Sequence, residues 1–179
     1  MNPLDPSALP TWSADGDLHV VIETPRGASV KLAWDPDLPA FTMTRALSLG
    51  VTYPYDWGFV PGTRAEDGDP LDALVLHDTA TYPGVVLACR ALGTVELLED
   101  GDDGERQANH RVVAVPVRID RLSDLKTLSD LPRRTREEIE QFFLSATFFT
   151  AKNAEIRGWK DAEATREYVR QCQRERGKR

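Results

Sequence analysis

Apolar residues recur in short runs, separated by turn residues, through the first two thirds of the chain. The runs are rich in Val, Leu and Thr and are bounded by Pro, Gly and Asp, which is typical of strands. We expect strands over residues 18–22, 30–34, 41–49, 74–76, 85–98 and 111–119. Because these short strands follow one another at close spacing, the pattern predicts a small β-barrel.

The last third of the chain changes to helical periodicity. Thr135 and Glu138 have the spacing of a capping box and precede an apolar face that includes Ile139. This pattern predicts a helix over about 135–147. A second helix is expected to begin at Asp161 and to run into the basic end of the chain. The predicted fold class is therefore α+β, mainly β, with two C-terminal helices.

A length of 179 residues suits one domain with its own core, so we expect residues 1–179 to form a single domain. Residues 1–16 contain three prolines and no clear period, which favours an arm laid over the surface. We expect the barrel over residues 17–119 and the helical part over residues 135–176.

Charge and composition narrow the class of protein. The chain has 22 Lys and Arg against 29 Asp and Glu, which gives a formal net charge of −7. This charge disfavours nucleic-acid binding, because a protein needs a basic face to bind the phosphates of a nucleic acid. No apolar stretch approaches the roughly 20 residues of a membrane helix, and no basic-then-apolar segment opens the chain. Cys89 and Cys172 form neither a disulfide framework nor a zinc motif. We expect a cytoplasmic protein without membrane or nucleic-acid partners.

The most informative segment holds four acids within seven residues. Carboxylates this close repel one another, so a fold that holds them together normally supplies a cation. Gly68 permits a tight turn and Pro70 stiffens it. Carboxylate oxygens suit Mg²⁺ or Mn²⁺ rather than zinc. An ordinary polar turn before a strand remains the alternative. The acids are Glu66, Asp67, Asp69 and Asp72.

Two further groups precede this segment. The aromatic run 53–63 is either a packed turn or a wall whose tyrosine hydroxyls point at a polar site. Lys31 and Arg45 lie on expected strands, with Glu23 nearby. Singly, each charge is most simply a solvated residue. Together with the acidic segment, they have the composition of a clamp for a small phosphate anion.

Three ordered segments, 21–27, 53–63 and 66–72, resemble the soluble family I inorganic pyrophosphatases. The resemblance continues more weakly through 112–116 to the C-terminal helices. It implies an OB-like five-stranded barrel with flanking helices. It also implies Mg²⁺-dependent hydrolysis of pyrophosphate to two phosphates, with Mn²⁺ as a possible substitute, in a homo-oligomer.

The resemblance also implies roles for individual residues. Asp69 would accept the proton of the attacking water, and Glu23 would contact a metal through water. The metal ligands would be Asp67, Asp72, Glu23, Asp100 and Asn109, and the substrate-binding residues would be Lys31, Arg45, Tyr53, Trp57 and Arg111. Counting residues forward from Gly93 to the family's acid after the long strand leads to either Glu99 or Asp100. The acidic loop 99–105 is either a solvated hairpin tip or a further metal site.

The chain also departs from the family pattern. Ala33 stands where the family has an acid, and Trp57 stands where it has a tyrosine. The family's Tyr-Lys pair after Phe142-Phe143 is missing, and Lys152 is the nearby cation that could replace it. Three functions therefore stay open: a pyrophosphatase, a hydrolase of another phosphoanhydride, or a non-catalytic protein that binds metal or phosphate.

Overall fold

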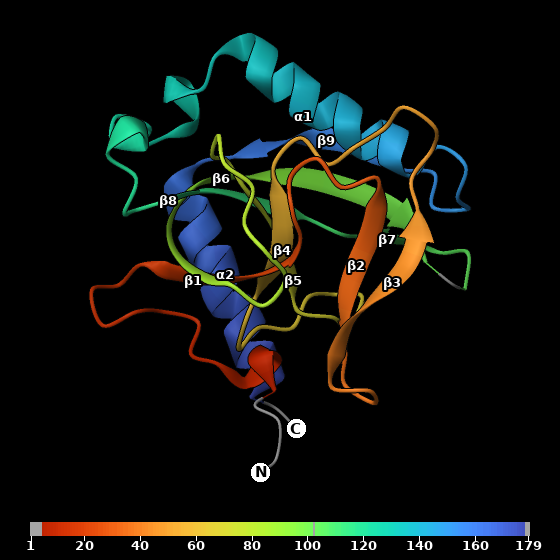
Figure 1. Cartoon of the computed structure of the whole chain (residues 1–179), viewed down its shortest axis with the longest axis horizontal. Coiled ribbons are helices and arrows are strands. Elements are labelled where there is room, and N and C mark those ends of the chain that lie inside the picture. Colours follow the sequence, from red (N-terminus) through yellow and green to blue (C-terminus); the bar gives the residue numbers. More distant parts are fainter. Residues whose placement is uncertain (1–4, 102, 178–179) are drawn as a thin grey trace.

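The computed structural model describes residues 5–101 and 103–177 (Figure 1). Its strands are β1 (Leu18–Thr24), β2 (Val30–Asp35), β3 (Ala40–Ala46), β4 (Asp56–Val60), β5 (Leu71–Val75), β6 (Val86–Asp100), β7 (Arg106–Ala108), β8 (Arg111–Pro116) and β9 (Glu155–Lys160). Its helices are α1 (Arg133–Ala146) and α2 (Ala162–Arg176), with single 3-10 turns at Pro6–Ala8, Asp120–Leu122 and Leu128–Asp130.

Five strands close into a ring. They pair in the order β1–β4–β5–β8–β6, and β1 also pairs with β6. Val21 of β1 lies opposite Phe59 of β4, and Leu18 lies opposite Cys89 of β6. The β5–β8 pair is parallel, and the other pairs of the ring are antiparallel. The predicted α+β fold, with an OB-like five-stranded barrel and two C-terminal helices, is confirmed.

Both faces of β5 are buried, and each face belongs to a different apolar cluster. Ala73 and Val75 pack in the cluster that includes Val169 of α2. Leu74, between them, packs in the cluster that includes Ile139 of α1. Figure 1 shows the two helices apart, with α1 above β6 and β9 and α2 behind the ring. Burial on both faces explains why the apolar run 73–75 of β5 lacks the alternation of a half-exposed strand.

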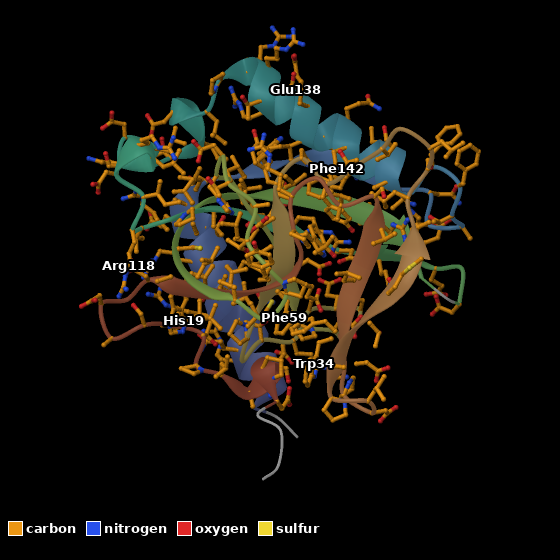
Figure 2. The ribbon with its side chains drawn as sticks, viewed as in Figure 1. His19, Trp34, Phe59, Arg118, Glu138 and Phe142 are labelled. Carbon is orange, nitrogen blue, oxygen red and sulfur yellow. The ribbon has the colours of Figure 1, made fainter. Side chains whose placement is uncertain are left out.

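Helix α1 begins earlier than the sequence predicts. Its N-cap is Pro132, and Thr135 lies inside the first turn without capping the helix. Glu138 instead pairs with Arg134 one turn before it, at 2.8 Å, so the expected capping box is wrong. The apolar face is as predicted: Figure 2 shows Phe142 directed toward the barrel and Glu138 away from it. The second helix begins at the predicted place, directly after Asp161, whose side chain caps it.

Three strands, β4, β7 and β9, lie where no strand was expected. Strand β4 falls in the aromatic segment, and all five of its residues are buried. Strand β9 falls in the segment expected to be helical, where it pairs with β6. Its sequence, Glu-Ile-Arg-Gly-Trp-Lys, is too polar to show the alternation of a buried strand.

The described part of the expected N-terminal arm packs against α2. Trp12 forms a bridge with Leu18, and its Nε1 donates a hydrogen bond to Gln173 Oε1 at 2.8 Å. Residues 1–4 of this arm lie outside the described residues, as do 178–179 of the basic C-terminal end. Within the described ranges, no helix has both the length and the apolar character needed to span a membrane.

A fully buried carboxylate fixes the start of β4. Asp56 accepts hydrogen bonds from Arg26 N at 2.7 Å, from Thr81 N at 3.1 Å and from Thr81 Oγ1 at 2.5 Å. His77 Nε2 lies 3.0 Å from its Oδ2. Burial opposes the charge, but the hydrogen bonds from His77 and Thr81 outweigh it and hold the pKa of Asp56 below its ordinary value. Asp56 therefore ties two loops to the strand that carries Trp57.

Candidate active site

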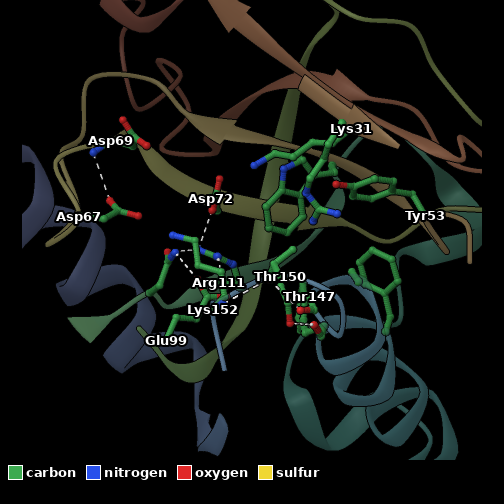
Figure 3. Close-up of a pocket in the computed structure, with 16 residues that line it drawn as sticks. Lys31, Tyr53, Asp67, Asp69, Asp72, Glu99, Arg111, Thr147, Thr150 and Lys152 are labelled. Atoms are coloured by element: carbon green, nitrogen blue, oxygen red, sulfur yellow. Dashed lines mark hydrogen bonds and ion pairs between the residues drawn. The ribbon is translucent and has the colours of Figure 1, made fainter. Parts of the chain in front are cut away.

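Two acids of the connection between β4 and β5 and a third acid from β5 line one cavity. Ala65 N donates to Asp69 O at 2.8 Å, and Asp69 N donates to Asp67 Oδ1 at 3.1 Å, which closes a tight turn. Gly68 has a φ of +91°, a left-handed conformation that residues with a side chain rarely adopt. The turn brings Asp67 and Asp69 to the cavity that Asp72 reaches from β5 (Figure 3).

Cations lie on the other side of this cavity, which has a volume of about 310 Å³. Lys31 and Arg45 are register partners on the hairpin of β2 and β3, and both line the cavity. The hairpin forms a separate two-stranded sheet, seen in front of the ring in Figure 1. The structure therefore brings together the acidic turn and the two cations, as the sequence predicted.

Aromatic side chains form part of the wall of this cavity. The Tyr53 ring centre lies 6.1 Å from that of Trp57 and 5.1 Å from that of Phe142. Burial raises the pKa of the Tyr53 hydroxyl. Trp57 is only 4% exposed, and its Nε1 is buried without a hydrogen-bond partner among the residues that the structure describes. The segment is thus both a packed aromatic cluster and part of the cavity lining, with one unused donor.

Arg111 connects Asp72, at the end of the acidic turn, to Glu99 and Asn109. Its Nη2 lies 3.5 Å from Glu99 Oε1, its Nη1 lies 2.5 Å from Asp72 Oδ2, and it donates to Asn109 Oδ1. Asn109 Nδ2 donates to Glu99 Oε2 at 2.9 Å. The Arg111 guanidinium carbon lies 5.3 Å from the centre of the Trp57 ring. One guanidinium group thus contacts three polar residues and one aromatic ring.

Asp100 does not line this cavity, although the sequence suggested it as a metal ligand. Its carboxylate accepts hydrogen bonds from Arg106 and Asn153, outside the cavity. Consecutive residues of a strand point to opposite faces, so the neighbour Glu99 reaches the cavity from β6 instead. The structure corrects the expectation for Asp100 and favours Glu99, the alternative that the count along the chain left open.

The acidic loop 99–105 makes the turn between β6 and β7. Gly101 N donates to Glu105 O at 2.8 Å, and Asp103 is exposed. Asp102 lies outside the described residues. Apart from Glu99, which is buried, the described part of the loop has the form of a solvated hairpin tip.

Glu23 lies behind the acidic turn rather than in the main cavity. Its Oε1 accepts a hydrogen bond from Trp34 N at 2.8 Å. It lines an adjoining cavity of about 260 Å³ that also contains Ala33, Lys31 and Asp72. Burial, together with the nearby charge of Asp72, raises the pKa of Glu23 to about 7.

The connection between α1 and β9 supplies lining residues that sequence patterns did not single out as a group. Thr147, Thr150 and Lys152 all line the main cavity. The connection has no helix or strand, so no periodicity marks its inward side chains. Only the charge of Lys152, and its position after the helix, could have indicated it.

The charges of the cavity suit a small anion bound beside a cation. Among the described residues, Lys31, Arg45 and Lys152 form no ion pair, whereas Arg111 is paired. Three cationic side chains are therefore available to phosphate oxygens. Burial raises the pKa of Asp67, and the neighbouring Asp72 charge adds to this, so a bound cation would relieve the repulsion.

The donor set fits a hydrated divalent cation. Within the described ranges, no three His, Cys, Asp or Glu side chains are close enough to hold an ion by themselves. A hard cation such as Mg²⁺ keeps several waters and uses one or two carboxylates together with substrate phosphates. Asp67, Asp69 and Asp72 offer such oxygens on one cavity wall, facing the cations that would hold the phosphates.

Comparison with known proteins agrees with this geometry. The family model described as Inorganic pyrophosphatase matches residues 20–176. The chain is 38% identical over 169 residues to an inorganic pyrophosphatase of Synechocystis sp., covering 94% of this chain and 97% of that protein. It is 40% identical over 158 residues to an inorganic pyrophosphatase of Thermus thermophilus, covering 87% of both chains.

Solved structures are similar as well. A crystal structure of inorganic pyrophosphatase from Thermus thermophilus superposes with a TM-score of 0.88 at 35% identity, covering 96% of this chain and 98% of that chain. The inorganic pyrophosphatase of Coxiella burnetii gives a TM-score of 0.84 at 32% identity, covering 93% and 99%. With its sequence, its fold and the acids and cations of its cavity in agreement, the chain belongs to the inorganic pyrophosphatase family.

Proposed function

We propose that this protein hydrolyses pyrophosphate to two phosphates, with Mg²⁺ as its metal ion and Mn²⁺ as a possible substitute. The observation that carries the proposal is the opposition of charges across one cavity. The acidic turn of Asp67, Asp69 and Asp72 lies on one side, and the unpaired cations Lys31 and Arg45 lie on the other. The family relationship supports the same reaction and implies a divalent metal ion.

The cations would hold and orient the substrate. Lys31, Arg45 and Lys152 would bind phosphate oxygens and offset their charge, which is the main protein contribution to phosphoryl transfer. The buried Nε1 of Trp57, which has no hydrogen-bond partner within residues 5–101 and 103–177, would donate to a phosphate oxygen. Tyr53 would pack beside this donor. Arg111 would keep Asp72 in place through their ion pair.

The acids would hold the metal ions and take the proton. Asp67, Asp72 and Glu99 would provide charged oxygens, Asn109 a neutral one, and Glu23 would act through water from the adjoining cavity. The metal ions, when bound, lower the pKa of water and offset the charge of the phosphates. Asp69, an exposed carboxylate on the turn, would accept the proton of the attacking water.

Phosphate release from pyrophosphate with Mg²⁺, then with Mn²⁺, tests the proposal. Asp69→Asn keeps the shape of the turn but removes the proton acceptor, so we expect turnover to fall by roughly 10³-fold while the fold is kept. Asp103→Asn, at the exposed β6–β7 turn, is the matched control and should keep full activity. Unchanged phosphate release in Asp69→Asn would rule out the assigned base.

A substrate panel separates the alternatives. Ala33 lines the adjoining cavity and leaves space there that a longer side chain would fill. The panel therefore includes substrates larger than pyrophosphate, namely nucleoside polyphosphates and linear polyphosphates. Preference for one of these substrates over pyrophosphate would favour the second alternative, a hydrolase of another phosphoanhydride. Binding of Mg²⁺ and phosphate without turnover of any substrate would favour a non-catalytic protein.

We further propose a cytoplasmic homo-oligomer. The buried thiols Cys89 and Cys172 are both free, as is usual in a reducing compartment. Large apolar side chains are exposed directly after α1, where Phe148 is 74% and Phe149 82% exposed, and on the segment after β3, where Leu49 is 103% exposed. Exposed apolar groups of this size mark interaction surfaces. Light scattering should give a multiple of the chain mass, which the double change Phe148→Ser and Phe149→Ser should reduce.

A further inference from the structure

Lys152 lies on a connection that contains neither helix nor strand. Local hydrogen bonds shape this connection: Thr150 N donates to Thr147 O at 2.9 Å, and Lys152 N donates to Thr150 Oγ1 at 3.3 Å. Ordering a lysine side chain loses much rotamer freedom, so a backbone that already points it at the ligand favours binding. Whatever fixes the backbone around Lys152 therefore affects the cavity.

The hairpin of β6 and β7 holds the backbone at Lys152 and at the residue after it. Asp100 N donates to Lys152 O at 2.6 Å, and Arg106 Nη1 donates to Asn153 O at 2.7 Å. Arg106 Nη1 also donates to Asp100 Oδ1 at 3.0 Å, and Asn153 Nδ2 donates to Asp100 Oδ2. The backbone carbonyl groups of Lys152 and Asn153 are thus held by Asp100 and Arg106, which also pair with each other.

The backbone turns sharply at this point. Asn153 has a φ of +45°, in the left-handed region that asparagine tolerates better than most residues. Arg106 Nη2 also lies 3.1 Å from Oε2 of Glu155, the first residue of β9. The guanidinium group therefore contacts both the cavity-lining connection and the strand that follows it.

We propose that Asp100, Arg106 and Asn153 are positioning residues that hold Lys152 on the cavity wall, where its ammonium group binds a substrate phosphate. This inference rests on the proposed function. Lys152 makes no ion pair among the described residues, so its charge is available. The side chains of Arg106 and Asp100 are 38% and 22% exposed, and exposed ion pairs add little to stability.

Kinetics of Arg106→Ala test the inference. We expect KM for pyrophosphate to rise about tenfold with kcat little changed, because the lost contact serves the bound substrate and the transition state alike. Lys152→Ala should give a similar rise. The double variant should be no worse than Lys152→Ala alone, because Arg106 acts through Lys152. The Kd of inorganic phosphate, measured by calorimetry, should follow the same pattern.

Arg157→Ala is the matched control. Arg157 also pairs with Glu155, at 2.7 Å, but makes none of the contacts at Lys152 and Asn153, so its loss should leave KM and Kd unchanged. Additive effects of Arg106→Ala and Lys152→Ala would overturn the inference, as would normal phosphate binding by Arg106→Ala.

Calorimetry keeps this test separate from that of the proposed function. A wild-type chain that binds phosphate without hydrolysing pyrophosphate would contradict the function, while the Kd comparison would still decide the role of Arg106. A wild-type chain that hydrolyses pyrophosphate, together with an unchanged KM in Arg106→Ala, would overturn the inference and leave the function standing.

Discussion

Arg111 Nη1 lies 2.5 Å from Asp72 Oδ2. Through Arg111, the acidic turn is connected to Glu99 of β6. The side chains of Arg111 and Asp72 are 8% and 20% exposed, so water screens the pair only weakly. The same guanidinium group faces Glu99. Arg111 is therefore the countercharge of both acidic groups whenever no metal ion is bound.

Arg111→Gln should destabilise the metal-free protein. We expect the free energy of unfolding in EDTA to fall by about 3 kcal/mol, because a buried carboxylate loses its partner. Mg²⁺ should restore part of the loss, since it binds the native state and supplies the missing charge. Thermal unfolding should therefore show a larger Mg²⁺-induced rise in Tm than for the wild type.

The control for this comparison is Arg133→Gln, which breaks an exposed pair with Glu137 and should change neither quantity appreciably. Equal responses to Mg²⁺ in Arg111→Gln and in the wild type would contradict the countercharge role.

Trp57→Phe should separate activity from stability. The substitution keeps an aromatic ring but removes the buried Nε1–H, which has no hydrogen-bond partner in the part of the chain that the structure describes. We expect kcat/KM to fall about tenfold, while the free energy of unfolding stays the same or rises, because an unsatisfied buried donor is lost. In contrast, Trp159→Phe removes a donor bound to Glu140 Oε1 at 2.5 Å, outside the cavity, and should lower stability while leaving kcat/KM intact.

Glu23 should make the metal-free protein less stable as the pH rises. Its pKa is raised by burial from 4.5 to about 7, so the native state holds the proton more tightly than the unfolded chain does. This contribution, about 3 kcal/mol, is fully present below about pH 4.5 and is lost as the pH rises through about 7.

Glu23→Gln stays neutral and keeps an oxygen for Trp34 N, so it removes this pH dependence. Urea unfolding in EDTA at about pH 5 and about pH 8 measures the difference between wild type and variant. A difference that is the same at both values would show that the carboxyl group has an ordinary pKa.

Asp56→Asn should lower the free energy of unfolding without altering the cavity. The buried carboxylate accepts hydrogen bonds from Arg26, His77 and Thr81, and an amide cannot accept them all. We expect a loss of about 3 kcal/mol in denaturant unfolding near neutral pH. Because the native pKa of Asp56 is lowered, its stabilising contribution is present above the unfolded pKa and disappears as the pH falls.

Asp78→Asn provides the comparison for this variant. Asp78 pairs with Arg121 at 2.7 Å on the surface, and its loss should reduce stability by less than about 1 kcal/mol. Similar losses in the two variants would mean that burial does not distinguish these carboxylates.

Local patterns in the sequence predicted a small barrel and the acidic turn, although they did not mark β4, one of the ring strands. Asp67, Asp69 and Asp72 are close along the chain, so a single turn decides their placement. Lys31 and Arg45 were also predicted, because they lie on strands that the apolar pattern marks. Residues that meet through one local turn or one hairpin are those that a sequence describes best.

Predictions that depended on counting across long segments were less secure. A shift of one residue in a strand reverses the face of every side chain, which is why the count could not separate Glu99 from Asp100. Strand β9 was missed because its neighbour β6, and not its own pattern, makes it a strand. The inward position of Lys152 depends on contacts with a distant hairpin, which no local pattern records.

The pairing of β1 with β6 has a consequence for synthesis of the chain. The ring cannot close until β6 and then β8, which ends at Pro116, have left the ribosome. Until then, β1, β4 and β5 present open edges that invite pairing with other nascent chains. The acidic turn is translated well before β8, so its carboxylates emerge without Arg111, the cation that offsets them in the finished barrel.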